Sequence, residues 1–89
     1  MIEREIRISN RLGLHARAAA KFVQEAGRFR ANIVLARDGQ TVDGKSILGI
    51  LTLAAGKGTR LVLRADGPDE SEALGALVRL IDDKFGEGQ

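Results

Sequence analysis

The chain has 89 residues, of which 14 are basic and 12 are acidic, a formal net charge of +2 and no cysteine. This length predicts one domain over residues 1–89 with a small core, and the lack of cysteine excludes a disulfide framework. An alkaline isoelectric point is the only feature that favours a nucleic-acid-binding protein, and no nucleic-acid partner is expected, because the charge excess is small and the only aromatic residues are three phenylalanines. No apolar run is long enough to span a membrane.

The first half of the chain predicts a strand, a loop and a helix. Isoleucines alternate with charged residues over residues 2–8, which is typical of a half-buried strand. After a loop to residue 14, apolar residues recur at helical spacing over residues 16–26, and Gly27 is a natural C-cap. The expected core face of this helix contains Ala19, Phe22, Val23 and Ala26. The expected outer face contains Arg17, Ala20, Lys21 and Gln24.

A hairpin and a short second helix are expected next. Asp38-Gly39 is a typical two-residue hairpin turn between strands over residues 31–37 and 40–43. Ser46 is a preferred N-cap residue and precedes a helix expected over residues 47–54.

The last part of the chain predicts a fourth strand over residues 59–66 and the longest helix over residues 69–84. The apolar stripe of that helix is expected to contain Leu74, Leu77, Val78, Ile81 and Phe85. Residues 86–89 are expected to form a frayed tail. The order β-α-β-β-α-β-α predicts an α+β fold in which helices cover one face of a four-stranded antiparallel sheet.

The second helix has almost no polar face. We expect Ile50, Leu53 and Ala54 to point inward, which leaves Leu48 and Leu51 outside. Neighbouring apolar side chains on a surface indicate a docking site. The alternative is a helix that is buried on all sides.

The only histidine of the chain lies between Gly13 and an alanine-rich run. Glycine marks a turn and alanine is the best helix former, so His15 is expected at the start of the first helix. The unpaired N–H groups and the positive dipole end at such a place suit phosphate oxygens. A neutral imidazole nitrogen can take and release a phosphoryl group, and the guanidinium of Arg17 matches phosphate geometry. The plainer alternatives are a surface histidine and a solvated arginine.

Two segments carry a family resemblance: Gly13-Leu14-His15-Ala16-Arg17 and Gly44-Lys45-Ser46-Ile47-Leu48-Gly49-Ile50. At their spacing they resemble the active-site and regulatory-serine signatures of HPr, the histidine phosphocarrier of the sugar phosphotransferase system. The resemblance covers nearly the whole chain and implies an open-faced β-sandwich with three helices on one side. It departs from the family at Ala18, where proline is usual, and proline would preset the first helical turn.

The resemblance also implies a function. Nδ1 of His15 would take a phosphoryl group from enzyme I and pass it to enzyme IIA, with Arg17 stabilising the phosphate. The protein would be a cytoplasmic, monomeric carrier rather than an enzyme, without cofactor or metal. In some bacteria a kinase phosphorylates the serine that corresponds to Ser46, although a serine at this place needs no role beyond capping. The expected partner surface contains Ala16, Ala20, Lys21, Gln24, Ile47, Leu48 and Leu51.

Two other functions stay open at this point. One is a carrier in the related nitrogen-regulatory relay. The other is an interaction module that transfers nothing and binds a regulator through its second helix; such a module would not need His15.

Overall fold

The computed structural model describes residues 1–89 and contains four strands, three α-helices and a short 3-10 helix. In chain order they are β1 (Ile2–Arg7), α1 (Ala16–Ala26), β2 (Asn32–Arg37), β3 (Gln40–Asp43), α2 (Ile47–Thr52), β4 (Arg60–Asp66), α3 (Glu70–Asp82) and η1 (Lys84–Gly86). The predicted order of elements is confirmed, with ends that differ by a few residues.

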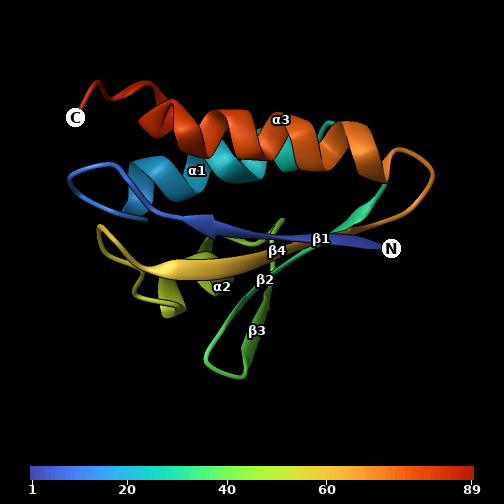
Figure 1. Ribbon diagram of the computed structural model, residues 1–89, viewed down its shortest axis with the longest axis horizontal. Helices are drawn as coiled ribbons and strands as arrows, with labels where there is room; N and C mark the ends of the chain where they lie inside the picture. The colour runs from blue at the N-terminus through green and yellow to red at the C-terminus, as the bar shows by residue number, and fades with distance from the viewer.

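The four strands form one antiparallel sheet in the order β1-β4-β2-β3 (Figure 1). The longest strand, β4, lies between β1 and β2, and its alternating Leu61, Leu63 and Ala65 point to the covered face. In this register Leu63 lies opposite Leu35 of β2. Because side chains alternate along a strand, this pairing places the apolar residues of neighbouring strands on the same face.

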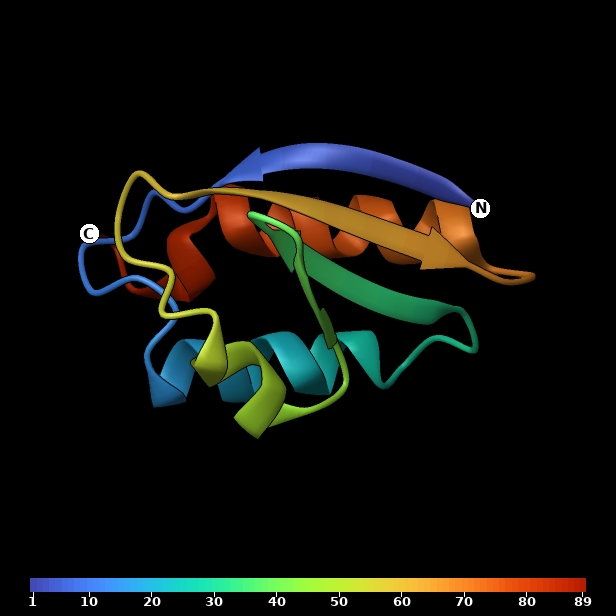
Figure 2. The same cartoon turned by 90° about the horizontal axis from the view of Figure 1, so that it is seen from below.

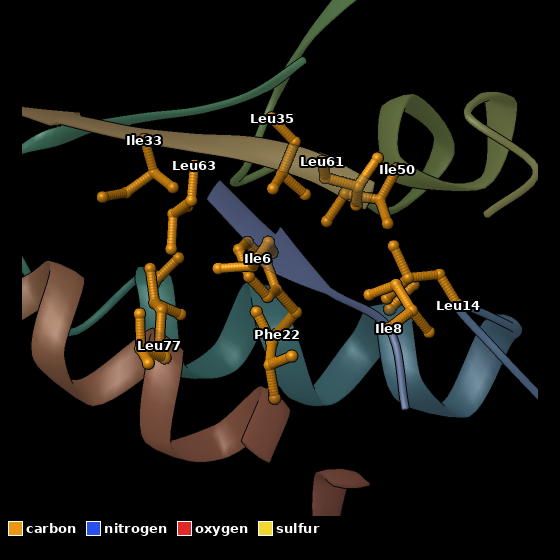
Figure 3. Close-up of a cluster of buried hydrophobic side chains, with 14 of the residues drawn as sticks. Ile6, Ile8, Leu14, Phe22, Ile33, Leu35, Ile50, Leu61, Leu63 and Leu77 are labelled. Atoms are coloured by element: carbon orange, nitrogen blue, oxygen red, sulfur yellow. The ribbon is translucent and has the colours of Figure 1, made fainter. Parts of the chain in front are cut away.

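The helices cover one face of the sheet and leave the other open, as predicted. Figure 1 shows α1 and α3 lying along the same side of the sheet, and Figure 2 shows α2 beside α1. The core between these layers contains 21 buried hydrophobic residues. Figure 3 shows Phe22 of α1 and Leu77 of α3 pointing toward the sheet residues, and Ile50 of α2 close to Leu14. Full burial of such a side chain contributes about 1.5–3 kcal/mol.

The inner face of α2 differs from the prediction. Ile50 and Leu53 are buried as expected, but the helix ends at Thr52 and Ala54 is exposed. Ala54 has a φ of 50°, a left-handed conformation that takes it out of the helical spacing. Leu51, expected outside, packs partly buried against the core. Leu48 is exposed, as predicted.

The end of the chain also differs. The helix α3 stops at Asp82, and Lys84 and Phe85 both have a φ of 55°, so the buried Phe85 reaches the core from a sharp turn. Ala73 is fully buried, whereas Leu74 is only partly covered. None of the helices combines the length and apolar character needed to cross a membrane.

Candidate functional site

The loop before His15 is held against the segment that follows α2. Gly13 has a φ of +70°, and a Cβ there would lie 2.5 Å from the carbonyl oxygen of Ala55. The N–H of Leu14 donates a hydrogen bond of 2.8 Å to that same oxygen, and the Leu14 side chain is buried. Only glycine fits this close approach without strain. The loop therefore has a defined position relative to the core, and so has the residue that follows it.

His15 is the N-cap residue of α1, as predicted, with extended backbone angles (φ −75°, ψ 178°). Its carbonyl oxygen accepts the first helical hydrogen bond, from the N–H of Ala19 at 2.8 Å. Its side chain makes no capping bond, so the N–H groups of the first turn have no partner within the helix. With the dipole of an 11-residue helix behind them, these donors suit an anion next to the imidazole.

The imidazole of His15 is oriented by Glu87, a residue of the tail. Nε2 lies 2.6 Å from Oε2 of Glu87, and the His15 side chain is 27% exposed. An ionised carboxylate can only accept hydrogen bonds, so Nε2 carries the proton and donates. In the neutral ring, the lone pair is then on Nδ1, which makes no hydrogen bond in the structure. The nitrogen available for chemistry is Nδ1.

A second hydrogen bond holds Glu87 from the other side. Nδ2 of the fully buried Asn10 donates to Oε1 of Glu87 at 3.0 Å and to the carbonyl oxygen of Gly13 at 2.7 Å. Burial raises the pKa of Glu87, but the hydrogen bonds from Asn10 and His15, together with the positive charges of His15 and the nearby Lys21, outweigh it, and the pKa lies below its ordinary value. Glu87 is therefore an anion at neutral pH.

These contacts correct the expectation of a frayed tail over residues 86–89. Besides Glu87, the carbonyl oxygen of Gln89 accepts a hydrogen bond of 2.8 Å from the N–H of Arg11. No sequence pattern identifies Asn10 or Glu87 as parts of the site. One carboxylate in a glycine-rich tail has no periodicity, and its partners are 72 and 77 positions away in the chain.

A hollow of about 720 Å³ opens beside the imidazole and is rich in basic side chains. It is lined by Arg11, Leu12, His15, Ala16, Arg17, Lys21, Gly86, Glu87 and Gln89. Arg17 is exposed and forms no ion pair, whereas Nζ of Lys21 donates to the carbonyl oxygen of Phe85 at 2.6 Å. Arg17 is thus free to bind an anion. A larger hollow, about 1060 Å³ between α1 and α3, lies away from His15 and contains neither His15 nor Arg17.

Ser46 does not line this hollow. It is the N-cap of α2, half-buried, and its Oγ accepts a hydrogen bond of 3.1 Å from the N–H of Gly49. The capping role predicted for it is confirmed, and any regulatory role is a separate matter.

Of the seven residues expected to meet a partner, four are exposed and three are half-buried. Ala16 and Gln24 are exposed, and Ala20, Lys21 and Leu51 are half-buried. Leu48 is 77% exposed and Ile47 41%. Leu12, at the tip of the loop before His15, is 66% exposed and was not singled out from the sequence. Apolar side chains therefore lie both on the loop before His15 and on α2.

Residues 2–83 match the family model described as "PTS HPr component phosphorylation site". The chain belongs to the HPr family. It is 52% identical over 89 residues to the phosphocarrier protein HPr of Cupriavidus necator, with both chains fully covered. To that of Pseudomonas aeruginosa it is 56% identical over 86 residues, covering 96% of each chain.

The structure of HPr from Thermoanaerobacter tengcongensis superposes with a TM-score of 0.95, at 49% identity and with 98% of each chain covered. The sequence resemblance to the HPr family and the predicted α+β fold are thus confirmed.

Proposed function

We propose that this protein carries phosphoryl groups in the phosphotransferase system: Nδ1 of His15 accepts one from phosphorylated enzyme I and donates it to enzyme IIA. The observation that carries the proposal is the state of the imidazole. Its Nε2 is held by Glu87, and its Nδ1 is free at the open N-terminus of α1, beside the unpaired Arg17. The chain would act in the cytoplasm as a carrier and not as an enzyme by itself.

The proposed chemistry needs little from the protein beyond position and charge. In a loose phosphoryl-transfer transition state, negative charge is spread over the three outer oxygens. The N–H groups of the first turn of α1 and the guanidinium of Arg17 can both donate to these oxygens. The Nδ1–P bond forms as the bond from phosphorus to the donor breaks, and the bonding electron pair goes to the donor.

The test is incubation with phosphoenolpyruvate and enzyme I, followed by intact mass and ³¹P NMR. We expect one acid-labile phosphoryl group on wild type and on Ser46→Ala, and none on His15→Ala. A wild type that stays unmodified by its cognate enzyme I would refute the carrier function and favour an interaction module.

Arg17 is proposed to bind the transferring phosphoryl group. Arg17→Ala should lower the rate of phosphoryl uptake about 10- to 100-fold without changing the free energy of unfolding, because the side chain is exposed and unpaired. Arg7→Ala, an exposed arginine of β1, is the matched control. Equal rates in the two variants would remove Arg17 from the mechanism.

A second proposal is that phosphorylation of Ser46 regulates docking. It is supported by the exposed Ile47 and Leu48 that follow Ser46, because a dianion beside this apolar patch would have to be desolvated when a partner binds. Ser46→Asp keeps a capping residue and should weaken enzyme I binding. Ser46→Asn, also a good cap but neutral, is the control. Equal binding by the two variants would contradict a charge-based regulation.

We also propose that the carrier is a monomer. One solved structure of Thermoanaerobacter tengcongensis HPr is described as a dimer, at 49% identity to this chain. Light scattering across a concentration series tests which state this chain adopts.

A further inference from the structure

Asn10, Glu87 and His15 form one continuous chain of hydrogen bonds. Each oxygen of the Glu87 carboxylate has one side-chain partner: Oε1 accepts from Nδ2 of Asn10 at 3.0 Å, and Oε2 accepts from Nε2 of His15 at 2.6 Å. Asn10 is 0% exposed, and its amide group is tied to the loop through the carbonyl oxygen of Gly13, 2.7 Å away. The chain therefore joins the tail, the loop before His15 and the imidazole.

The orientation of the Asn10 amide follows from its neighbours. Both the Gly13 carbonyl and the Glu87 carboxylate are acceptors, so the NH₂ group must face them. This leaves Oδ1 of Asn10 buried without a partner. A buried unpaired acceptor lowers stability, so stability alone does not account for an asparagine here.

We propose that Glu87 is a positioning residue for phosphoryl transfer, which Asn10 holds in place, and that together they keep His15 in the tautomer whose lone pair is on Nδ1. This inference rests on the proposed function, in which Nδ1 is the atom that reacts. It assigns a role in that reaction to the tail, which would otherwise have none.

The role follows from the two tautomers of neutral imidazole. A proton on Nδ1 would block that nitrogen, whereas a proton on Nε2 leaves it nucleophilic. When Nδ1 forms its bond to phosphorus and the donor keeps the electrons of the broken bond, the ring gains positive charge while Nε2 keeps its proton. The carboxylate hydrogen-bonded to Nε2 stabilises this charge, as an orienting carboxylate does for other reactive histidines.

Glu87→Gln tests the proposal with an isosteric change. Asn10 donates to position ε1, so it should select the Gln oxygen and turn the Gln NH₂ group toward Nε2 of His15. Nε2 would then have to accept, and the proton would move to Nδ1. We expect ¹⁵N NMR of the neutral ring to show this inverted tautomer, and phosphoryl uptake to fall about 10- to 100-fold, the range found when an outer partner of a metal-ligating histidine is removed.

Two further variants test the role of Asn10 and whether the effect is specific to Glu87. Asn10→Ala combined with Glu87→Gln removes the group that selects the oxygen, so the ring should return to a mixture of tautomers. Glu25→Gln is the control, because Glu25 pairs with Arg28 and touches neither His15 nor Asn10; it should keep the wild-type tautomer and rate.

A Glu87→Gln protein with the wild-type tautomer, or with uptake within about twofold of wild type, would overturn the proposal. If Glu87→Gln does not fold, Glu87→Ala replaces it, with a tautomer mixture expected and an unchanged tautomer overturning the proposal. A wild type that takes no phosphoryl group would instead refute the proposed function, and the tautomer measurement would still show whether Glu87 and Asn10 set the proton position.

Discussion

The N-termini of α1 and α2 show opposite solutions to the same problem. Every helix begins with N–H groups that have no partner inside the helix. At α2 the fold satisfies one of them itself, because Oγ of Ser46 accepts from the N–H of Gly49. At α1 the N-cap residue is His15, whose side chain is turned to Glu87 and caps nothing. The first helix thus leaves all of these donors free for a ligand, whereas the second satisfies one of them with its own N-cap side chain.

The two regions also differ in what surrounds them. The start of α1 borders a hollow that contains Arg11, Arg17 and Lys21. The start of α2 is followed by the exposed Ile47 and Leu48. One helix start is surrounded by basic side chains, which suit an anion, and the other leads into an apolar surface. Substitutions can test each of these differences between the two helix starts.

The largest expected effect is at Gly13, which places the start of α1. Gly13→Ala adds a Cβ within 2.5 Å of the Ala55 carbonyl oxygen at a φ of +70°, so we expect the free energy of unfolding to fall by about 3 kcal/mol or more. Urea unfolding measures it, and phosphoryl uptake should fall as well because His15 is displaced.

Gly39→Ala is the matched control for that substitution. Gly39 has a φ of +84°, but nothing lies within 4 Å of the added Cβ, so only the backbone cost of about 1–2 kcal/mol remains. Equal decreases in the free energy of unfolding for the two substitutions would show that the close approach of Gly13 to Ala55 does not contribute to the effect.

Substitutions at two leucines of α2 separate its exposed apolar surface from the side that packs against the core. Leu51→Asp should lower the free energy of unfolding by about 2 kcal/mol, because Leu51 packs partly buried against the core. Leu48→Asp should change it by less than about 0.5 kcal/mol, because Leu48 is 77% exposed, and should weaken enzyme I binding in calorimetry. If Leu48→Asp unfolds the protein, Leu48 belongs to the core.

Ser46→Ala removes the side chain that caps the start of α2. Loss of the hydrogen bond to Gly49 should lower the free energy of unfolding by about 1 kcal/mol, while phosphoryl uptake by His15 stays unchanged. Ser46→Asn should recover most of the stability. A slower uptake in Ser46→Ala would mean that the two helix starts are coupled.

The smallest expected effect is on the pH dependence of the free energy of unfolding, through Glu87 at the start of α1. The pKa of Glu87 is lower in the folded protein than in the unfolded chain, so its contribution to stability is present above the unfolded value of 4.5 and is lost as the pH falls through the folded value. The free energy of unfolding of wild type should therefore exceed that of Glu87→Gln by less below pH 4.5 than at neutral pH. A constant difference in urea unfolding would contradict this linkage.

Local patterns predicted much of this molecule. Alternation gave the strands, 3.6-residue spacing gave the helices, and Gly13 followed by His15 and alanines placed the histidine at the start of α1. The exposure of Leu48 was also predictable, because a short helix that buries Ile50 cannot bury its opposite side. Leu51 was predicted wrongly, since its exposure depends on how α2 lies against its neighbours.

By itself, the sequence determined the elements, the fold class and the candidate nucleophile, because each depends on neighbours within a few residues. Residue patterns did not decide which nitrogen of His15 is free: the family resemblance implied Nδ1, and only the tertiary structure shows the contact that leaves it free. That choice depends on Glu87, 72 positions further along the chain, and on the buried Asn10 that holds it. A hydrogen bond across such a separation exists only once the core has packed and the turn at Phe85 has brought the tail back.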